Sequence, residues 1–460
     1  MNHFNKRNIM YALGILPESV LYNLIVTYLL VFLTDMAGLK ALVAGAVCMF
    51  GSLWDALLTP YIGYRFDRWT HDRRMFLLSA VPMSIFVVFL FVDVNFGIPL
   101  KLIYYLVFSL LTYTFFCLYA IPYYALCMNI FDDSEQRVKI RGLSSFINAF
   151  AIYFGSAVPI LIISGLQKNG IGAGAAWALS FALIGILMAA VGLSTFKIIG
   201  PVKIGKQNPA PGSDMGLLKT CFDIFKLKVV RRFSVFTFFY MVGSTVIQMN
   251  YLYLIRYKLH MSDSILSLVQ LFSVVCVLLL VPLITSLAVK YDKRKISIIF
   301  LALMVAGLIL MKGIGVNGLA ELIGLGLVRA LGTASFWTLF YPFSYELAEL
   351  DELINNKRRE GAVTSFIQTV QKIGTAISPQ ILSILLLISG FVAGNDQQTA
   401  AVANGIESVS TIYSAGFLAV ALAAIISYPV TKKHNRLLAD KISQKRRDME
   451  YRLDDLREIM

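Results

Sequence analysis

The chain has 460 residues, of which 58% are hydrophobic and only 15% are charged, and its formal net charge is +14. Soluble globular domains average roughly 45–50% apolar and about 25% charged residues, so the composition excludes an ordinary soluble domain and predicts a polytopic membrane protein. The positive charges lie in short segments between apolar runs, which excludes the compact basic domain that nucleic-acid binding requires.

Apolar runs follow one another along the chain, and a helix that crosses a lipid bilayer needs about 20 such residues. We predict an all-α membrane protein with twelve transmembrane helices, at 9–34, 41–66, 75–95, 99–130, 142–166, 173–197, 232–256, 263–290, 296–314, 318–348, 361–391 and 405–430.

The basic residues indicate the orientation of the chain. Both termini and the segments after even-numbered helices are rich in lysine and arginine, for example Arg73 and Arg74 after the second helix, whereas the opposite loops hold few. Such segments stay in the cytoplasm during membrane insertion. We therefore expect a multi-pass protein of the cell (plasma) membrane with both termini cytoplasmic.

A stretch containing proline, glycine and lysine, 198–231, predicts a cytoplasmic linker between an N-terminal six-helix bundle (1–197) and a C-terminal one (232–430). The halves resemble each other, since DRWTHDRR after the second helix is matched by KYDKRK after the eighth. Two such halves are typical of the major facilitator fold, whose bundles move about a central site. Residues 431–460 are predicted to form a cytoplasmic amphipathic tail.

Few ionisable side chains lie deep in the predicted helices, and each is costly in hydrocarbon, so each is a candidate functional residue. They are Glu18, Asp55, Arg329 and Lys372. Asp55 and Lys372 belong to opposite halves, and an ion pair between them would reduce the cost of burying each. A substrate or cation could compete for this pair; the alternative is a static salt bridge. Asp35 and Arg256 lie at helix ends, where they can reach water, and are not counted as candidates.

Other candidate substrate contacts are aromatic or polar. Tyr123 and Trp337 could stack on a sugar ring, and Gln368 near Lys372 could hydrogen-bond to it, although most aromatic residues of a membrane protein pack or lie at the interface. An inward-facing Arg329 would bind a carboxylate and favour an anionic substrate; a structural partner is equally compatible with the sequence. The sequence contains no histidine cluster, metal-ligand spacing or nucleophile constellation, so we expect no enzyme activity, metal or cofactor.

Four segments carry a recognisable pattern: FLTDMAGL at 32–39, WDALLTPYIGYRFDR at 54–68, YAIPYYAL at 119–126 and YELAELDELINNKRREGAVTSFIQTVQKIGTA at 345–376. They resemble the corresponding segments of the glycoside–pentoside–hexuronide:cation symporters, a melibiose-permease-like family of the major facilitator superfamily. The resemblance implies a twelve-helix fold and cation-linked uptake of a sugar or glycoside by alternating access.

The resemblance weakens at the cation-coupling residues. The family carries two acids one turn apart on the second helix, which are matched here by Asp55 and Thr59, and its fourth-helix acid is replaced by Ala120. Sodium needs several oxygen ligands, whereas one buried carboxylate can still bind and release a proton. We therefore expect coupling to H⁺ at Asp55, or no coupling, rather than coupling to Na⁺.

The family's sugar-binding residues are also only partly retained. Trp337 and Lys372 match its tenth-helix tryptophan and eleventh-helix lysine. Its first-helix aspartate aligns with Ser19, next to Glu18, and its fifth-helix arginine appears as Ser145. The galactoside specificity of the family is therefore not carried over.

These observations predict a monomeric secondary transporter of a sugar, glycoside or related small organic solute. The alternative substrate is a lysolipid or another amphipathic molecule, because an animal branch of the superfamily also resembles the second-helix motif. From another class of protein, loss of the cation-site acids is compatible with a non-transporting sensor or assembly protein built on a transporter scaffold.

Overall fold

The computed structural model describes residues 6–67, 72–130, 134–201, 223–355, 360–393 and 398–431, with single positions up to 444. The regular structure of these residues is entirely helical. The first half forms α1 (Lys6–Leu13), α2 (Leu16–Val31), η1 (Phe32–Met36), α3 (Ala41–Asp67), η2 (Arg73–Ser79), α4 (Ala80–Leu90), α5 (Ile98–Ile130), α6 (Ser134–Lys168) and α7 (Ala173–Ile199). The second half forms α9 (Lys228–Tyr253), η3 (Leu254–Lys258), α10 (Ile265–Lys290), α11 (Lys293–Ile314), α12 (Leu319–Asn355), α13 (Glu360–Ile388), α14 (Ala400–Ser408), η4 (Val409–Tyr413) and α15 (Ser414–Ile426).

The helices confirm the predicted membrane fold. Within the described residues, 11 helical segments are long and apolar enough to cross a membrane. The remaining predicted span, 75–95, corresponds to a shorter apolar helix, Arg74–Leu90. This helix ends before the polar residues Asp93 and Asn95. Residues 202–222 of the predicted linker (198–231) and most of the predicted tail lie outside the described residues, and α9 begins at Lys228, inside the predicted linker.

The chain divides into two compact units. Unit 1 comprises Met1–Pro209, Gln248–Leu271 and Pro379–Ile406, and unit 2 comprises Ala210–Ile247, Phe272–Ser378 and Glu407–Met460. The boundaries cross α9, α10, α13 and α14, so unit 1 contains the whole first half together with parts of several helices from the second half. The predicted division at the linker stays a prediction.

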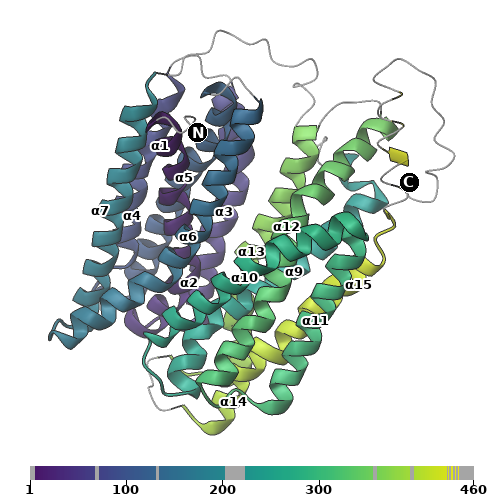
Figure 1. The fold of residues 1–460 in the computed structure, drawn as a ribbon. Coiled ribbons are helices and arrows are strands. Elements are labelled where there is room, and N and C mark those ends of the chain that lie inside the picture. Colours follow the sequence, from purple (N-terminus) through teal and green to yellow (C-terminus); the bar gives the residue numbers. More distant parts are fainter. Residues whose placement is uncertain are drawn as a thin grey trace. The chain divides into compact units, whose positions relative to one another are not determined.

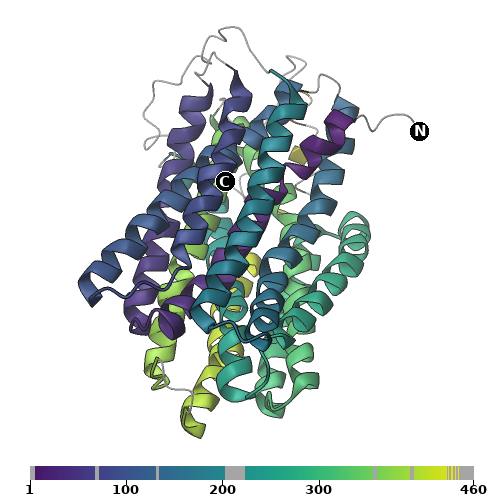
Figure 2. The same cartoon turned by 90° about the vertical axis from the view of Figure 1, so that its left-hand side faces the viewer.

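Helices α1–α7 of unit 1 form a bundle in which they lie side by side (Figures 1 and 2). The helix α2 packs against α6 and α7, α3 packs against α5, and α4 contacts α5 and α7. Aromatic side chains fill the space between α2, α4 and α7: Phe91 stacks on Phe181 with 4.0 Å between ring centroids, and Trp177 contacts Tyr28 edge-on. The buried hydroxyl of Tyr28 donates to the carbonyl of Ser156, which satisfies its polar end.

In unit 2, α11 packs against α12 and α15. Two ion pairs lie inside this unit: Lys293 at the start of α11 pairs with the buried Glu346 of α12, and Lys312 near its end lies 3.3 Å from the buried Glu407 of α14. The prediction of deep ionisable residues omitted Lys312 and Glu407. A buried carboxylate needs such a partner because its charge is poorly solvated.

The two halves repeat local features at a spacing of 220 or 222 residues. Prolines occur inside three pairs of equivalent helices: Pro60 and Pro282, Pro122 and Pro342, and Pro159 and Pro379. The charged segments repeat too. The side chain of Asp72 accepts a hydrogen bond from the backbone N–H of Arg74, two residues later, and that of Asp292 accepts one from the backbone N–H of Arg294. This internal repeat is a property of many transporter folds.

Each of these arginines also contacts the last helix of its own half. Arg74 donates to the carbonyl of Phe196 in α7, and Arg294 donates to the carbonyl of Ile426 in α15. The last carbonyls of a helix lack partners within the helix, so the arginines satisfy them.

The repeat includes one difference in backbone strain. Gly38 and His260, 222 residues apart, follow the π-helical turns η1 and η3 with φ of 68° and 51°. A positive φ costs a residue with a side chain roughly 1 kcal/mol. We expect Gly38→Ala to lower the melting temperature of the purified protein in detergent, and His260→Gly to leave it unchanged or raise it. A comparable loss of stability in both variants would contradict this assignment.

Candidate substrate and coupling sites

Asp55 is enclosed between α3 and α5 and has an exposed fraction of 4%. The thiol of Cys117 donates to Asp55 Oδ1 at 2.7 Å, and the hydroxyl of Thr59 donates to the Asp55 carbonyl oxygen at 2.8 Å. Thr59 Oγ1 lies 3.7 Å from Cys117 Sγ. Cys117 is not among the residues expected from the sequence, because a cysteine in an apolar run shows no polar role.

The chemistry of this cluster follows from its donor set. Asp55 supplies the one carboxylate, Thr59 a hydroxyl and Cys117 a soft sulfur. Hard cations such as Na⁺ and Ca²⁺ prefer several oxygen ligands, and thiols favour softer metals. The coupling ion expected from the sequence stays a prediction.

A second polar cluster joins α2, α5 and α6 within unit 1. Tyr124 donates from its hydroxyl to Glu18 Oε2 at 3.0 Å, and the hydroxyl of Ser19 donates to the side-chain oxygen of Asn148. Asn23 donates to the Ser19 carbonyl at 2.9 Å. Glu18 is half-buried and Tyr124 is 37% exposed. Asn148 is not among the residues expected from the sequence, because it carries no charge and matches no motif.

Tyr123, the predicted stacking residue, is fully buried in this conformation. Its ring stacks on Tyr11 at 4.9 Å and on Tyr119 at 6.0 Å, and its hydroxyl donates to the Tyr11 carbonyl. A side chain at Gly14 would approach the Tyr123 ring within 2.8 Å. Tyr123 therefore packs α1 against α5 here, and the neighbouring Tyr124 offers the exposed ring.

In unit 2, the predicted residues Arg329 and Trp337 lie on one face of α12. Residues four apart on a helix lie nearly above one another. Thr333 lies between them, and Tyr341 and Tyr345 follow further along α12, but each step of four residues turns about 40°, so Tyr345 faces away from Arg329. Trp337, Tyr341 and Tyr345 are 43%, 41% and 58% exposed.

Gln368 and Lys372 are four residues apart on α13, and both are half-buried. They therefore share a face of this helix. Asp55 belongs to unit 1 and Lys372 to unit 2. The predicted ion pair between them stays a prediction, as do the substrate-binding roles of Gln368 and Lys372.

Comparison with known proteins gives full-length relatives. The isoprimeverose transporter of Lactiplantibacillus pentosus is 24% identical, over 94% of this chain and 90% of the relative. The glucuronide carrier protein homolog of Escherichia coli (strain K12) is 22% identical, over 97% of both chains. The sodium-dependent lysophosphatidylcholine symporter 1-A of Danio rerio is a partial match. It is 28% identical, over 33% of this chain and 30% of the relative.

Among solved structures, the nucleoside transporter NupG matches the fold with a TM-score of 0.65 at 13% identity, over 93% of this chain and 100% of that one. The family model described as MFS/sugar transport protein matches residues 10–432. These matches confirm the predicted family of cation symporters and a transporter rather than an enzyme. With the all-helical fold and the motifs around Asp55, they establish that the chain belongs to the MFS/sugar transport protein family.

Proposed function

We propose that this secondary transporter moves a sugar, glycoside or related small polyhydroxylated solute by alternating access, and that Asp55 couples the movement to protons. The observation that carries the coupling is the enclosed carboxylate of Asp55, which receives a hydrogen bond from Cys117 and has Thr59 where a second acid would be needed for sodium. Uncoupled transport is the alternative.

The substrate class is supported by two features of the chain and by the names of its relatives. Glu18, Tyr124 and Asn148 present carboxylate, hydroxyl and amide groups that hydrogen-bond to sugar hydroxyls. Trp337 and Tyr341 present exposed aromatic faces that stack on apolar faces of a sugar ring. Two full-length relatives are named for isoprimeverose and glucuronide.

The neutral Ser19–Asn148 pair and the Glu18 carboxylate favour an uncharged substrate over an anionic one at the unit 1 cluster, because Glu18 would repel a substrate carboxylate there. Arg329 in unit 2 is the group that would favour an anion.

We propose that the protein acts as a monomer in the plasma membrane. Both termini lie in the cytoplasm in this proposal, as the distribution of basic residues predicts.

A lysolipid is the second candidate substrate, because the partial match to a lysophosphatidylcholine symporter covers a third of the chain. The shorter coverage makes it the weaker candidate.

The function is tested by uptake into proteoliposomes of a panel containing pentosides, hexosides, hexuronides and a lysolipid. Each solute is offered under a proton gradient, a sodium gradient and no gradient. We expect one or more of the glycosides to be taken up, with stimulation by inward-directed protons and none by sodium. Sodium-driven uptake would overturn proton coupling, and uptake of the lysolipid alone would overturn the sugar class. Absence of flux for the whole panel would support a sensor or assembly protein.

A further inference from the structure

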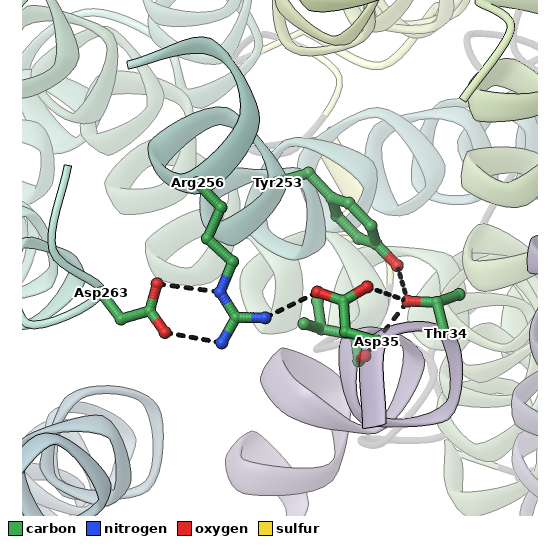
Figure 3. A network of polar contacts seen from close by, with 6 residues as sticks. Thr34, Asp35, Tyr253, Arg256 and Asp263 are labelled. Carbon is green, nitrogen blue, oxygen red and sulfur yellow. Dashed lines mark hydrogen bonds and ion pairs between the residues drawn. The ribbon is translucent and has the colours of Figure 1, made fainter. Parts of the chain in front are cut away.

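A network of polar contacts joins segments of unit 1 that are far apart in the sequence (Figure 3). Arg256 of η3 lies with Nη1 2.6 Å from Asp35 Oδ2 of η1. Its Nε and Nη2 donate to the two carboxylate oxygens of Asp263 at 2.8 and 2.6 Å, a bidentate geometry. The Asp35 side chain is only 8% exposed and that of Arg256 is 20% exposed. Arg256 is therefore an enclosed cation between two carboxylates, rather than a residue that reaches into water.

The same two segments make a second contact nearby. The hydroxyl of Thr34 donates to Asp35 Oδ1 at 2.8 Å, and the hydroxyl of Tyr253 lies 2.9 Å from Thr34 Oγ1. Thr34 and Tyr253 are both fully buried. Tyr253, at the end of α9, and Arg256 of η3 are about one helical turn apart. These two residues therefore hold η1, which continues α2, at two points. Figure 3 shows both contacts around Asp35.

A second pair of helix segments approaches closely in unit 1. A Cβ at Gly45, near the start of α3, would lie 2.8 Å from Ser383 Cβ and 3.0 Å from Gln380 Oε1, both in α13. The absence of a side chain at Gly45 thus allows α3 and α13 to come together. Like the Arg256 network, this contact joins a helix of the first half to a helix of the second, at the ends predicted to face outward.

The roles of the two acids differ. Asp263 is seven positions from Arg256 in the same half, so it orients the guanidinium. Asp35 comes from the other half and makes the contact that joins the halves. Removal of Arg256 would leave two carboxylates facing each other, and their mutual repulsion would add to the loss of both ion pairs.

We propose that Arg256 is the central positioning residue of an outer closure, which holds the outward ends of α2–η1 and α9–η3 together in one state of the transport cycle. The outer closure consists of Thr34, Asp35, Tyr253, Arg256 and Asp263. The proposal rests on the alternating access proposed above, because the halves must part at this end to admit substrate. Polar groups suit a contact that repeatedly breaks, since water replaces their partners when it opens.

The test measures opening without needing a substrate. Ala37, 3% exposed beside the closure, is replaced by cysteine in the full-length protein, which is reconstituted and labelled with a membrane-impermeant maleimide from the outside. We expect Arg256→Gln and Asp35→Asn to raise the labelling rate by about tenfold or more, and Asp263→Asn to raise it less. The parent protein without the Ala37 substitution measures labelling of native cysteines.

Matched variants separate opening from damage to the fold. Outside the closure, Arg74 pairs with Asp72 at 2.6 Å, the same distance as in the Arg256–Asp35 pair, and the two pairs are similarly exposed. Arg74→Gln breaks this pair and should not raise labelling. Gly45→Val should raise labelling, whereas Gly165→Val should not, because nothing lies within 4 Å of a Cβ at Gly165. The double variant Asp35→Arg with Arg256→Asp should label more slowly than either single variant.

The transport readout distinguishes this role from a purely structural one. Opened variants should lose net uptake more than substrate exchange, and Asp35→Asn, which leaves Arg256 paired with Asp263, should keep a melting temperature near that of the parent. Labelling that stays at the parent rate in both Arg256→Gln and Asp35→Asn would overturn the outer closure. Increased labelling in a protein that transports no solute of the panel would uphold the closure and overturn the proposed function instead.

Discussion

Replacement of Asp55 by asparagine is expected to abolish proton-driven accumulation of substrate, with a fall in concentrative uptake of at least about tenfold, while exchange of substrate across the membrane continues. Asparagine has the shape of the protonated acid but cannot release a proton, so a proton-coupled cycle cannot complete its return step. The measurement compares net uptake under a proton gradient with counterflow in proteoliposomes preloaded with unlabelled substrate.

Variants of the two neighbouring side chains provide the controls for Asp55→Asn. Cys117→Ser keeps a hydrogen-bond donor beside the carboxylate and should retain accumulation, whereas Cys117→Ala removes the donor and should reduce accumulation. Thr59→Val removes a hydroxyl that donates to the Asp55 backbone and should have the smallest effect. Accumulation by Asp55→Asn equal to that of the parent would exclude Asp55 as the coupling residue.

Replacement of Lys293, the cation of the buried Lys293–Glu346 ion pair, is expected to lower the free energy of unfolding more than any of the other substitutions. Lys293 Nζ also donates to the Pro342 carbonyl at 3.2 Å and lies 5.5 Å from the ring centroid of Phe343. Lys293→Met would leave Glu346, 7% exposed, without its cation, and such a change costs about 3–5 kcal/mol. The melting temperature of the purified protein in detergent measures this loss.

Two further variants test whether charge is the cause. Adding Glu346→Gln to Lys293→Met should recover part of the lost stability, because it removes the uncompensated charge. Lys226→Ala breaks the exposed pair with Asp223, in which the lysine side chain is 66% exposed, and should cost no more than about 1 kcal/mol. Equal losses for Lys293→Met and Lys226→Ala would show that burial of the pair has no energetic role.

The sequence by itself determined the membrane fold and the positions of its helices. The predicted span 41–66 corresponds to Ala41–Asp67, and the predicted span 173–197 corresponds to Ala173–Ile199. Such agreement has a simple cause: in hydrocarbon every backbone N–H and C=O must be bonded within the segment, so length and apolar composition are enough to identify a helix. The motif around Asp55 also identified the family, because its residue types and spacing lie within one helix.

Only the tertiary structure decided which distant side chains meet. Cys117 is 62 positions from Asp55, Asn148 is 129 from Ser19, and Arg256 is 221 from Asp35. Sequence reasoning placed Arg256 at a helix end where it could reach water, and the structure instead encloses it between two acids. Helical periodicity states which residues share a face, whereas contacts between helices depend on close packing, as at Gly45, and on the pairing of charges that the bilayer cannot solvate.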